Sequence, residues 1–307
     1  MRRVCLVAGW MATVPAALGL LAFFGSLVWF LDLAANFRPQ LAAITLLLGL
    51  VALAGQRGLA VLVLAAGVVN AVVVVPHLLF GGPGITGADR IEVMVFNVGV
   101  SNPNREEVVG FIAAEDPDVV FLFESSFEWE DAIRAADLPL RLVTIVPRGR
   151  VAGVTVLARP SLLPGVVEVR LGGEAAALAV NLDGERIEIL GLHPPSPTDA
   201  ARSGRRDRML SDAADWVAGR DGEVVVVGDL NATPWSHAFV TLRERGGLID
   251  TLAGSGLQPT WPDGWGPLSI PIDHLLHTAG LGSEGRHTGP AFGSAHRPVL
   301  VTIGHSG

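Results

Sequence analysis

The chain has 307 residues, of which 50% are hydrophobic and only 17% are charged, and its mean hydropathy is +0.47. This mean is too high for an ordinary soluble domain, which indicates that part of the chain lies in a membrane. All 22 basic residues are Arg, Tyr is absent and Cys5 is the single cysteine, which excludes lysine Schiff bases, tyrosyl nucleophiles, internal disulfides and thiolate zinc clusters. Asp, Glu, His, Asn, Ser, Arg and a metal ion remain for catalysis.

Hydrophobic residues are concentrated in the first 80 positions. No charged residue occurs from residue 4 to residue 31, and two further largely apolar stretches cover residues 39–56 and 58–80. About 20 apolar residues cross the hydrocarbon layer of a membrane, and a signal peptide has a shorter apolar stretch than the first of these. The sequence therefore predicts a membrane anchor over 1–80 that contains three transmembrane helices. The middle stretch is short, so a re-entrant segment is the alternative there.

The positions of arginine residues predict how this anchor is oriented. Arg2 and Arg3 favour a cytoplasmic N-terminus, and three crossings of the plasma membrane would then place residues beyond about 85 outside the cytoplasm. A re-entrant middle stretch would instead leave them inside. Asn70 and His77 interrupt the third stretch, and the place of His77 near its end favours the membrane interface. Because the apolar stretches contain no charged residue, the helices are expected to anchor the protein rather than to guide a lipid.

A Gly- and Pro-rich segment at residues 81–89 is typical of a linker. Beyond it, residues 90–307 contain all but two of the 30 acidic residues and all but four of the 22 arginines, which gives this part a formal charge of −10. Such a charge argues against broad binding to nucleic-acid phosphates and is compatible with a divalent cation site. The sequence contains no second linker and no internal repeat, so residues 90–307 are predicted to form one domain.

Strand and helix patterns alternate along this domain. Short apolar runs predict strands over 91–96, 118–123, 151–157, 176–182, 186–192, 223–227, 270–276 and 298–303. Helical periodicity predicts helices over 104–115, with Asn104 and Glu107 at the spacing of a capping box, over 199–218, and from Ser236 to about residue 245. A turn at Asp183-Gly184 joins two of the strands. Mixed strands and helices of this kind favour an α/β layered fold over a barrel.

Polar residues stand directly at the ends of many predicted strands. They are Asn97, Glu124, His193, Asp229 with Asn231, and Asp273, while Ser294 and His296 precede the last strand. Polar side chains that gather at one edge of a sheet are where α/β proteins place their sites. Singly, an Asp or Asn after a strand is more often a turn former or a helix cap, so the prediction of a site rests on the convergence of six such ends.

Six short motifs carry a resemblance to a known family. They are FN at 96–97, PDVVFLFE at 117–124, the lone His193, GDLNATPWS at 228–236, IDH at 272–274 and GSAHRPV at 293–299. In this order they resemble the endonuclease/exonuclease/phosphatase (DNase I-like) superfamily of metal-dependent phosphoric ester hydrolases, across essentially all of residues 90–307. The resemblance implies a four-layer α/β/β/α sandwich of two packed mixed sheets flanked by helices. It also implies a site at one edge of the sheets.

The same resemblance implies a metal site. Glu124 would be the main ligand of Mg²⁺ or Mn²⁺ with Asn97 assisting, and Mg²⁺ prefers hard oxygen ligands of this kind. One position departs from the family pattern, which has S-D-H before R-P where this chain has Ser294-Ala295-His296. Because the missing Asp is a secondary carboxylate at the metal, Ala295 is expected to weaken metal binding or to remove a second metal. An altered but active site is favoured over an inactive one.

The resemblance further assigns catalytic roles. His296 would be the general base or a phosphate-contacting group, with Asp273 fixing its tautomer and orientation. Asp229 would position the attacking water or assist proton transfer, Asn231 would hold phosphoryl oxygens, and His193 would contact the phosphate. Phosphoryl transfer requires mainly charge neutralisation and an aligned nucleophile, which this set supplies.

For three further residues the sequence leaves two positions open. Arg202 and Arg206 are four residues apart in the predicted helix and can face the same way, either towards solvent or towards an anionic substrate head group near His193. Trp261 either packs beside the site or lies in lipid headgroups.

Three functions are compatible with these observations. The order of three helices and a catalytic domain resembles that of the membrane-anchored teicoplanin-resistance (VanJ-like) proteins, which implies hydrolysis of a lipid-linked phosphate or pyrophosphate such as a polyprenyl carrier of the cell envelope. An extracytoplasmic nuclease is the second hypothesis, although the net charge of −10 argues against a nucleic-acid partner. A degenerate binding domain, explained by Ala295, is the third. All three stay open because the fold does not determine the substrate.

Overall fold

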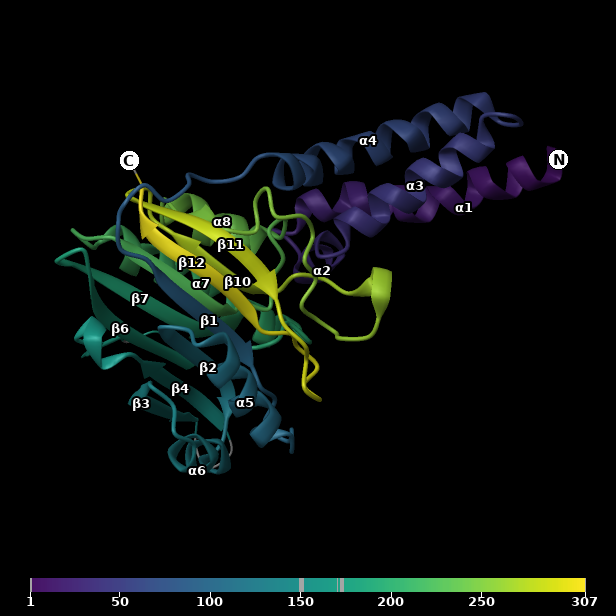
Figure 1. Cartoon of the computed structure of the whole chain (residues 1–307). Helices are drawn as coiled ribbons and strands as arrows, with labels where there is room; N and C mark the ends of the chain where they lie inside the picture. Colours follow the sequence, from purple (N-terminus) through teal and green to yellow (C-terminus); the bar gives the residue numbers. More distant parts are fainter. Residues whose placement is uncertain (1, 149–151, 170, 172–173, 307) are drawn as a thin grey trace.

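The apolar N-terminal residues form a bundle of helices in the computed structural model, which describes residues 2–148, 152–169, 171 and 174–306. Its elements are α1 (Arg2–Leu21), the 3-10 helix η1 (Ala22–Phe24), α2 (Trp29–Ala35), α3 (Arg38–Ala52) and α4 (Arg57–Leu79). Helices α1, α3 and α4 lie side by side, with the N-terminus at the end of the bundle remote from the rest of the chain (Figure 1). The short helix α2 lies at the opposite end, against the second part of the molecule.

Two of the described helical segments, residues 3–24 and α4, are long and apolar enough to cross a membrane. Helices α2 and α3 form a pair bent by 67°, which makes a third span only if the pair is counted as one. The first predicted span, over 4–31, is therefore wrong at its end, because the helix stops at Phe24 and a turn precedes α2. At Gly25 an added Cβ would lie 2.9 Å from the backbone of Asp32, so the chain folds back closely there.

A polar contact joins two helices of the bundle. The guanidinium of Arg38 donates from Nη1 to Oδ1 of Asn70 at 2.9 Å, and Asn70 donates from Nδ2 to the Ala66 carbonyl at 3.0 Å. A Cβ at Gly19 would lie 2.4 Å from the Asn70 amide, so a glycine is needed where α1 passes this group. Asn70 thus connects α3 and α4, and nothing in its contacts points to a ligand.

The described strands of the second part form two mixed sheets of six strands each. The first has the order β11 (Leu281–Thr288), β12 (Val299–His305), β1 (Ile91–Asn97), β2 (Val119–Ser125), β4 (Ala152–Ala158) and β3 (Arg141–Arg148). The second has the order β5 (Gly165–Val167), β6 (Glu174–Leu182), β7 (Glu185–His193), β8 (Val224–Asp229), β10 (Asp273–His277) and β9 (Ile249–Asp250). Within them, β1 pairs with β2 and β7 with β8 in parallel, and all other pairs are antiparallel.

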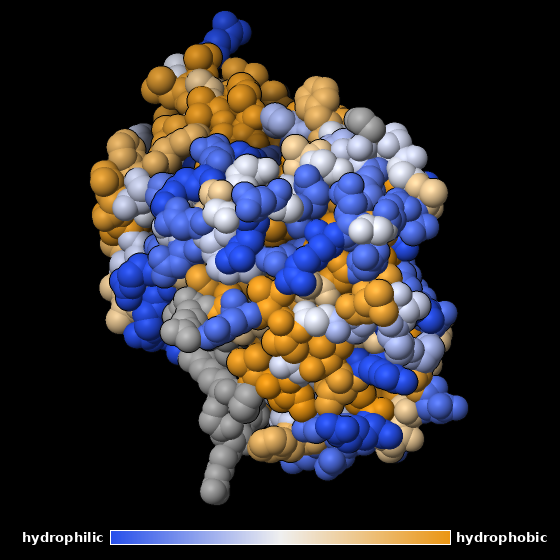
Figure 2. All heavy atoms as spheres, turned by 90° about the vertical axis from the view of Figure 1, so that its left-hand side faces the viewer, coloured by the Kyte–Doolittle hydropathy of each residue, from blue (hydrophilic) through white to orange (hydrophobic). Residues whose placement is uncertain are grey.

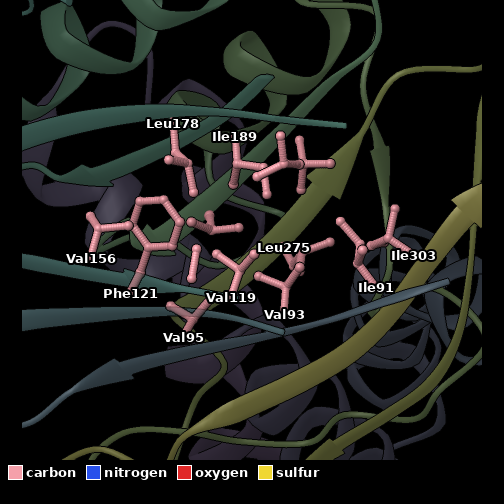
Figure 3. Packing of buried hydrophobic residues seen from close by; sticks show 14 of the residues in the cluster. Ile91, Val93, Val95, Val119, Phe121, Val156, Leu178, Ile189, Leu275 and Ile303 are labelled. Atoms are coloured by element: carbon pink, nitrogen blue, oxygen red, sulfur yellow. The ribbon is translucent and has the colours of Figure 1, made fainter. Parts of the chain in front are cut away.

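The main hydrophobic core lies between the two sheets. Figure 3 shows Val95 and Phe121 of the first sheet directed towards Leu178 and Ile189 of the second. A Cβ at Gly191 would lie 2.4 Å from the Phe121 ring, so the close approach of β7 to β2 requires glycine there. The continuous apolar runs of β2 and β8 follow from this arrangement, because strands covered on both faces have no solvent side.

Helices cover the outer face of each sheet. They are α5 (Arg105–Glu115) and α6 (Phe127–Ala135) on the first sheet, and α7 (Ala200–Ala218) and α8 (His237–Arg245) on the second. The predicted α/β/β/α layers are therefore present. The predicted helices over 199–218 and from Ser236 correspond to α7 and α8, and the side chains of Asp199 and Ser236 cap them. The predicted capping box of Asn104 is wrong, since its side chain donates to the Phe292 carbonyl instead.

Residues 80–90 connect the bundle to the sheets without forming a helix or strand. This connection is held to the first sheet by backbone hydrogen bonds, in which Thr86 and Gly87 donate to the His305 carbonyl and Ser283 donates to that of Pro83. Of the predicted strand over 151–157, Val151 lies outside the described residues and the remainder belongs to β4. Figure 2 shows hydrophobic residues gathered on the bundle at the top, while the sheet domain presents hydrophilic residues together with a hydrophobic patch in its lower half.

Candidate active site

Six strand ends meet at one edge of the two sheets. The parallel pairs β1–β2 and β7–β8 end there, and β10 and β12 begin there because they run antiparallel to their neighbours β8 and β1. In register, the first residue of β10 pairs with the last of β8. The residues placed together in this way are Asn97, Glu124, His193, Asp229, Asp273 and His296.

Local backbone geometry directs two of the carboxylates into the site. Glu124 has φ = 54° and stands at a register irregularity between β2 and β4, which is the kind of bulge that redirects a side chain at the end of a strand. Gly228 precedes Asp229 with φ = 150°, and a Cβ there would lie 1.9 Å from the Leu192 carbonyl oxygen. Only glycine allows this close approach, which brings β8 against the end of β7.

The amide of Asn97 connects the two sheets. Its Nδ2 donates to Oε1 of Glu124 at 3.1 Å and to Oδ2 of Asp229 at 3.0 Å. The imidazole of His193 lies beside the same two carboxylates, with Nε2 at 3.3 Å from Glu124 and Nδ1 at 3.5 Å from Asp229. Ser294 donates from Oγ to the Asn97 carbonyl at 2.7 Å and accepts from the backbone N–H of His296 at 3.0 Å.

His296 forms the second connected group. Its Nδ1 lies 2.9 Å from Oδ2 of Asp273, and its Nε2 lies 3.7 Å from Oδ2 of Asp229. The Trp261 ring lies 6.4 Å from the His296 ring, centroid to centroid, which places Trp261 beside the site. Of the two positions that the sequence leaves open for Trp261, the structure supports the one beside the site, next to His296.

The charges of the site differ in how they are stabilised. A hydrogen bond from His193 lowers the pKa of Glu124 to about 2, and burial opposes this only in part. Burial raises the pKa of Asp229, against the attraction of His296. Burial also disfavours the charged form of His296, but Asp273 and Asp229 outweigh it and raise the pKa of His296 to about 9. Glu124 is therefore an anion and His296 a cation at neutral pH.

A cavity of about 590 Å³ borders these residues. Its polar lining residues include Asn97, Glu124, Asp229, Asn231 and His296, and its apolar ones include Trp261, Ile270 and Ile272. Asn231 has φ = 50°, a conformation that Asn tolerates. Its Nδ2 donates to the Pro194 carbonyl at 3.1 Å, and an amide nitrogen carries two hydrogens, so the other is available towards the cavity.

Leu33, Asn36 and Phe37 also line this cavity, although they belong to the N-terminal bundle. Sequence reasoning missed them, because it treated this segment as a break between two membrane helices. One signal was present: Asp32 and Asn36, like Leu33 and Phe37, are one helical turn apart, so the segment has a polar and an apolar face.

Arg206 takes neither of the two positions that its spacing leaves open, towards solvent or towards a substrate head group. Its guanidinium is buried, bonded from Nη2 to Asp32 at 2.6 Å and from Nη1 to the Asn231 carbonyl at 3.1 Å, so it contacts the bundle rather than a ligand. Arg202 donates from Nε to the Ser196 carbonyl at 2.9 Å and reaches the cavity rim only through that residue. Likewise His193 is not among the described residues that line the cavity, and its ring bridges Glu124 and Asp229.

The donor set fits a divalent cation. Three carboxylates, from Glu124, Asp229 and Asp273, converge with the histidines, and one ligand atom from each of Asp229, Asp273 and His296 lies within 4.8 Å of the others. This buried acidic and histidine group could hold a metal ion. The carboxylate of Glu124 offers a more open position, because its side chain is 33% exposed at the cavity. Ala295 lines the cavity without a ligand atom.

Comparisons with known proteins agree with this geometry. Residues 94–296, more than half of the chain, match the model of the Endonuclease/Exonuclease/phosphatase family. No curated protein matches the chain in sequence.

Solved structures share the fold at low sequence identity. An endonuclease/exonuclease/phosphatase from Bacteroides vulgatus has a TM-score of 0.58 and 16% identity, covering 71% of this chain and 100% of that one. The human Nocturnin catalytic domain with bound sulfate anion has a TM-score of 0.56 and 16% identity, over 71% and 95%. D. rerio TDP2 complexed with single-strand DNA product has a TM-score of 0.56 and 14% identity, over 70% and 99%. The chain therefore belongs to the endonuclease/exonuclease/phosphatase family and is a metal-dependent phosphoester hydrolase.

Proposed function

We propose that this protein is a membrane-tethered phosphoesterase that hydrolyses a lipid-linked phosphate or pyrophosphate of the cell envelope, as the VanJ-like resemblance implies. The observation that carries this proposal is the composition of the catalytic cavity. Glu124, Asp229 and His296 form part of its wall, and another part of the wall comes from Leu33 and Phe37 of the helical bundle. A phosphate with an attached hydrocarbon matches a site that combines polar reacting groups with apolar side chains contributed by the apolar helices.

The residues of the site have complementary tasks in such a reaction. Protonated His296, oriented by Asp273, binds a phosphoryl oxygen and stabilises the charge that develops there. Asp229 lies 3.7 Å from His296, at the position to orient the attacking water and to accept its proton. Asn231 supplies an amide hydrogen to a second phosphoryl oxygen. His193 holds Glu124 and Asp229 in place rather than contacting the phosphate.

Glu124 is the proposed metal ligand, with Asn97 beside it. The alternative group of Asp229, Asp273 and His296 is less suitable, because Oδ2 of Asp273 is already bonded to His296 and a cation there would compete with the imidazolium. Mg²⁺ or Mn²⁺ at Glu124 would neutralise phosphate charge and polarise the phosphorus–oxygen bond. An amide oxygen is also a good ligand for such cations. The Asn97 amide would have to turn its oxygen towards Glu124, since Nδ2 faces it now.

The arrangement of the helices supports an extracytoplasmic domain in the plasma membrane. The N-terminal end of α1 and the sheet domain lie at opposite ends of the bundle (Figure 1). If Arg2 and Arg3 hold the N-terminal end in the cytoplasm, the sheet domain lies on the other side. Helix α3 has 15 residues, about 23 Å at 1.5 Å per residue, which is short for a span by itself, so an outside domain requires that the bent pair α2–α3 makes the third crossing. A reporter fused to the C-terminus that is active only in the cytoplasm should give no signal.

The central experiment offers two substrates to the purified full-length protein in parallel. With Mg²⁺ or Mn²⁺ present, phosphate release from undecaprenyl pyrophosphate is the expected result. Cleavage of DNA without lipid hydrolysis would instead make the protein a nuclease, and neither activity would indicate a degenerate binding domain. Glu124→Gln and His296→Gln should abolish lipid hydrolysis. Glu128→Gln is a matched control, because that side chain is 67% exposed on α6.

A further inference from the structure

Helix α2 and the turn after it, residues 29–37, form part of the catalytic cavity; we call them the α2 segment. This segment connects two apolar helices of the bundle, yet Leu33, Asn36 and Phe37 line the same cavity as Glu124 and His296. An anchor that served only to hold the domain at a membrane would not need to contribute side chains to the catalytic cavity.

An ion pair fixes the α2 segment to the sheet domain. Asp32 accepts a hydrogen bond from Nη2 of Arg206 at 2.6 Å and another from the backbone N–H of His237 at 2.6 Å. The side chains of Asp32 and Arg206 are only 3% and 1% exposed. A buried ion pair of this kind contributes little net stability, because both charges lose their hydration. Its effect is to fix one position of α2 on helices α7 and α8.

A second set of hydrogen bonds reaches the loop that carries the catalytic residues. Asn36 accepts from the backbone N–H of Thr233 at 3.0 Å and from its hydroxyl at 2.9 Å, and the Asn36 carbonyl accepts from Nε1 of Trp235 at 3.2 Å. Thr233 and Trp235 follow Asn231 in the same loop. Arg206 also donates to the Asn231 carbonyl at 3.1 Å. The α2 segment is thus bonded to the structure that positions Asp229 and Asn231.

The α2 segment contributes two apolar residues to the cavity wall. Leu33 and Phe37 are one helical turn apart and both line it, together with Trp261 and Ile270 of the sheet domain. Phe37 and Trp261 are each 37% exposed, which is a large fraction for aromatic side chains at a cavity wall. Exposed apolar surface often marks a binding site. Beside a polar reaction centre, it can bind the hydrocarbon part of a substrate.

We infer that the α2 segment is the part of the active site that recognises the hydrocarbon of an amphiphilic phosphate ester, with Leu33 and Phe37 as specificity-determining residues and Asp32 as a positioning residue. This inference rests on the proposed function and makes it more specific. A cavity of about 590 Å³ holds a ligand of drug size, so it takes the phosphate end and the first carbons of the chain. The remaining hydrocarbon lies along the bundle.

The test compares two pyrophosphates that share a head group and differ in chain length. The full-length protein in detergent, with Mn²⁺, is given farnesyl pyrophosphate or isopentenyl pyrophosphate, and KM and kcat are measured for each. Phe37→Ala should raise KM for the farnesyl substrate roughly 10- to 100-fold, the loss expected for one buried aromatic contact. It should change KM for the isopentenyl substrate less than about threefold. Leu33→Ala should act in the same direction.

Two variants serve as controls on this comparison. Phe30→Ala makes the same chemical change on α2 at a side chain that is 55% exposed and is not among the described lining residues, so it should leave both KM values unchanged. Phe37→Leu keeps an apolar side chain and should restore most of the farnesyl preference.

A further variant tests the positioning role of Asp32. Asp32→Asn removes the charge that pairs with Arg206, so it should raise KM for the farnesyl substrate more than for the isopentenyl substrate.

The outcomes separate this inference from the proposed function. If the wild-type protein hydrolyses farnesyl pyrophosphate but Phe37→Ala and Leu33→Ala leave its KM unchanged, the inference is wrong and the proposed function stands. An equal rise of KM for both substrates also contradicts it, because the wall would then act on the head group. If the wild-type protein hydrolyses neither pyrophosphate nor undecaprenyl pyrophosphate, the proposed function itself fails, and the inference with it.

Discussion

His296 and Asp273 form a buried pair in which Nδ1 of the imidazole lies 2.9 Å from Oδ2 of the carboxylate, while Nε2 is directed towards Asp229. The pair fixes the orientation of the ring at the cavity. Asp273→Asn should therefore lower kcat roughly 10²- to 10⁴-fold, because the amide stabilises neither the tautomer nor the imidazolium. Kinetics with a lipid pyrophosphate measure this loss. Asp263→Asn, at a partly exposed carboxylate that pairs with Arg297, is the control and should retain activity.

The same pair predicts how activity depends on pH. Asp273 and Asp229 raise the pKa of His296 to about 9 against the effect of burial, so the imidazolium persists through neutral pH and is lost as the pH rises through about 9. Because the proposed role requires the charged form, kcat/KM should fall above that pH. In Asp273→Asn the fall should begin at a lower pH, since the largest stabilising charge is gone. An alkaline limb that stays in place in this variant would show that His296 is not the titrating group.

Glu124 gives the clearest prediction for metal binding. Its pKa of about 2, caused mainly by the hydrogen bond from His193, keeps the carboxylate ionised at neutral pH. Glu124→Gln removes that charge while keeping the shape, so the affinity for Mn²⁺ should fall at least roughly tenfold. Titration calorimetry on the wild type, Glu124→Gln and the exposed-site control Glu128→Gln measures it. Equal affinities in the three proteins would place the metal at Asp229, Asp273 and His296 instead.

Much of the sheet domain follows from its sequence, and the exceptions have a common cause. The central strands β1, β2, β7 and β8 are buried on both faces and therefore show apolar runs. The strands that sequence reasoning did not predict are β3, β5, β9 and β11, which are the edges of the two sheets in the described residues. An edge strand has a neighbour on one side only and is more open to solvent. In β11, exposed residues accordingly lie between buried ones, so its sequence shows neither a continuous apolar run nor a regular alternation.

Site residues that stand at strand ends could be predicted from the sequence. Site residues whose position depends on a contact with a distant part of the chain could not. Asn97 and Glu124 stand at strand ends, and the parallel order of β1 and β2 alone brings them together. Arg206 shares a helix face with Arg202, but spacing cannot show that Asp32, 174 positions earlier in the chain, lies opposite it. The part of the cavity wall formed by Leu33 was hidden for the same reason.

Ala295 is a position where adding one carboxylate should strengthen the site. It lines the cavity between Ser294 and His296, and its carbonyl accepts from the backbone N–H of Asp263 at 2.8 Å, so the backbone is held while the side chain is free to change. Ala295→Asp should raise the affinity for Mn²⁺, because an additional oxygen ligand of negative charge favours hard cations. Titration of Mn²⁺ against the activity of both proteins measures the change. Unchanged affinity and turnover would mean that this position does not face the metal.

His277 predicts a loss of stability in acid that is independent of catalysis. The side chain is buried, with Nδ1 at 2.9 Å from the Thr278 carbonyl and no partner for Nε2 among the described residues. Burial lowers its pKa below the ordinary value of 6.5, although the hydrogen bond to the Thr278 carbonyl and the charges of Glu223 and Asp250 partly oppose this. Below about pH 6.5 the unfolded chain therefore binds a proton that the folded protein does not, and each further pH unit costs up to about 1.4 kcal/mol.

The predicted loss of stability in acid can be tested directly. The Tm of the wild type in detergent should be highest above pH 7 and should fall between pH 6.5 and 5. In His277→Phe, which fills the same space without a titrating group, the fall should be smaller by the contribution of one proton. His287→Phe, at a side chain that is 48% exposed, should keep the wild-type slope. If His277→Phe keeps that slope as well, His277 takes up a proton in the folded state, and the burial of its ring does not exclude the charge.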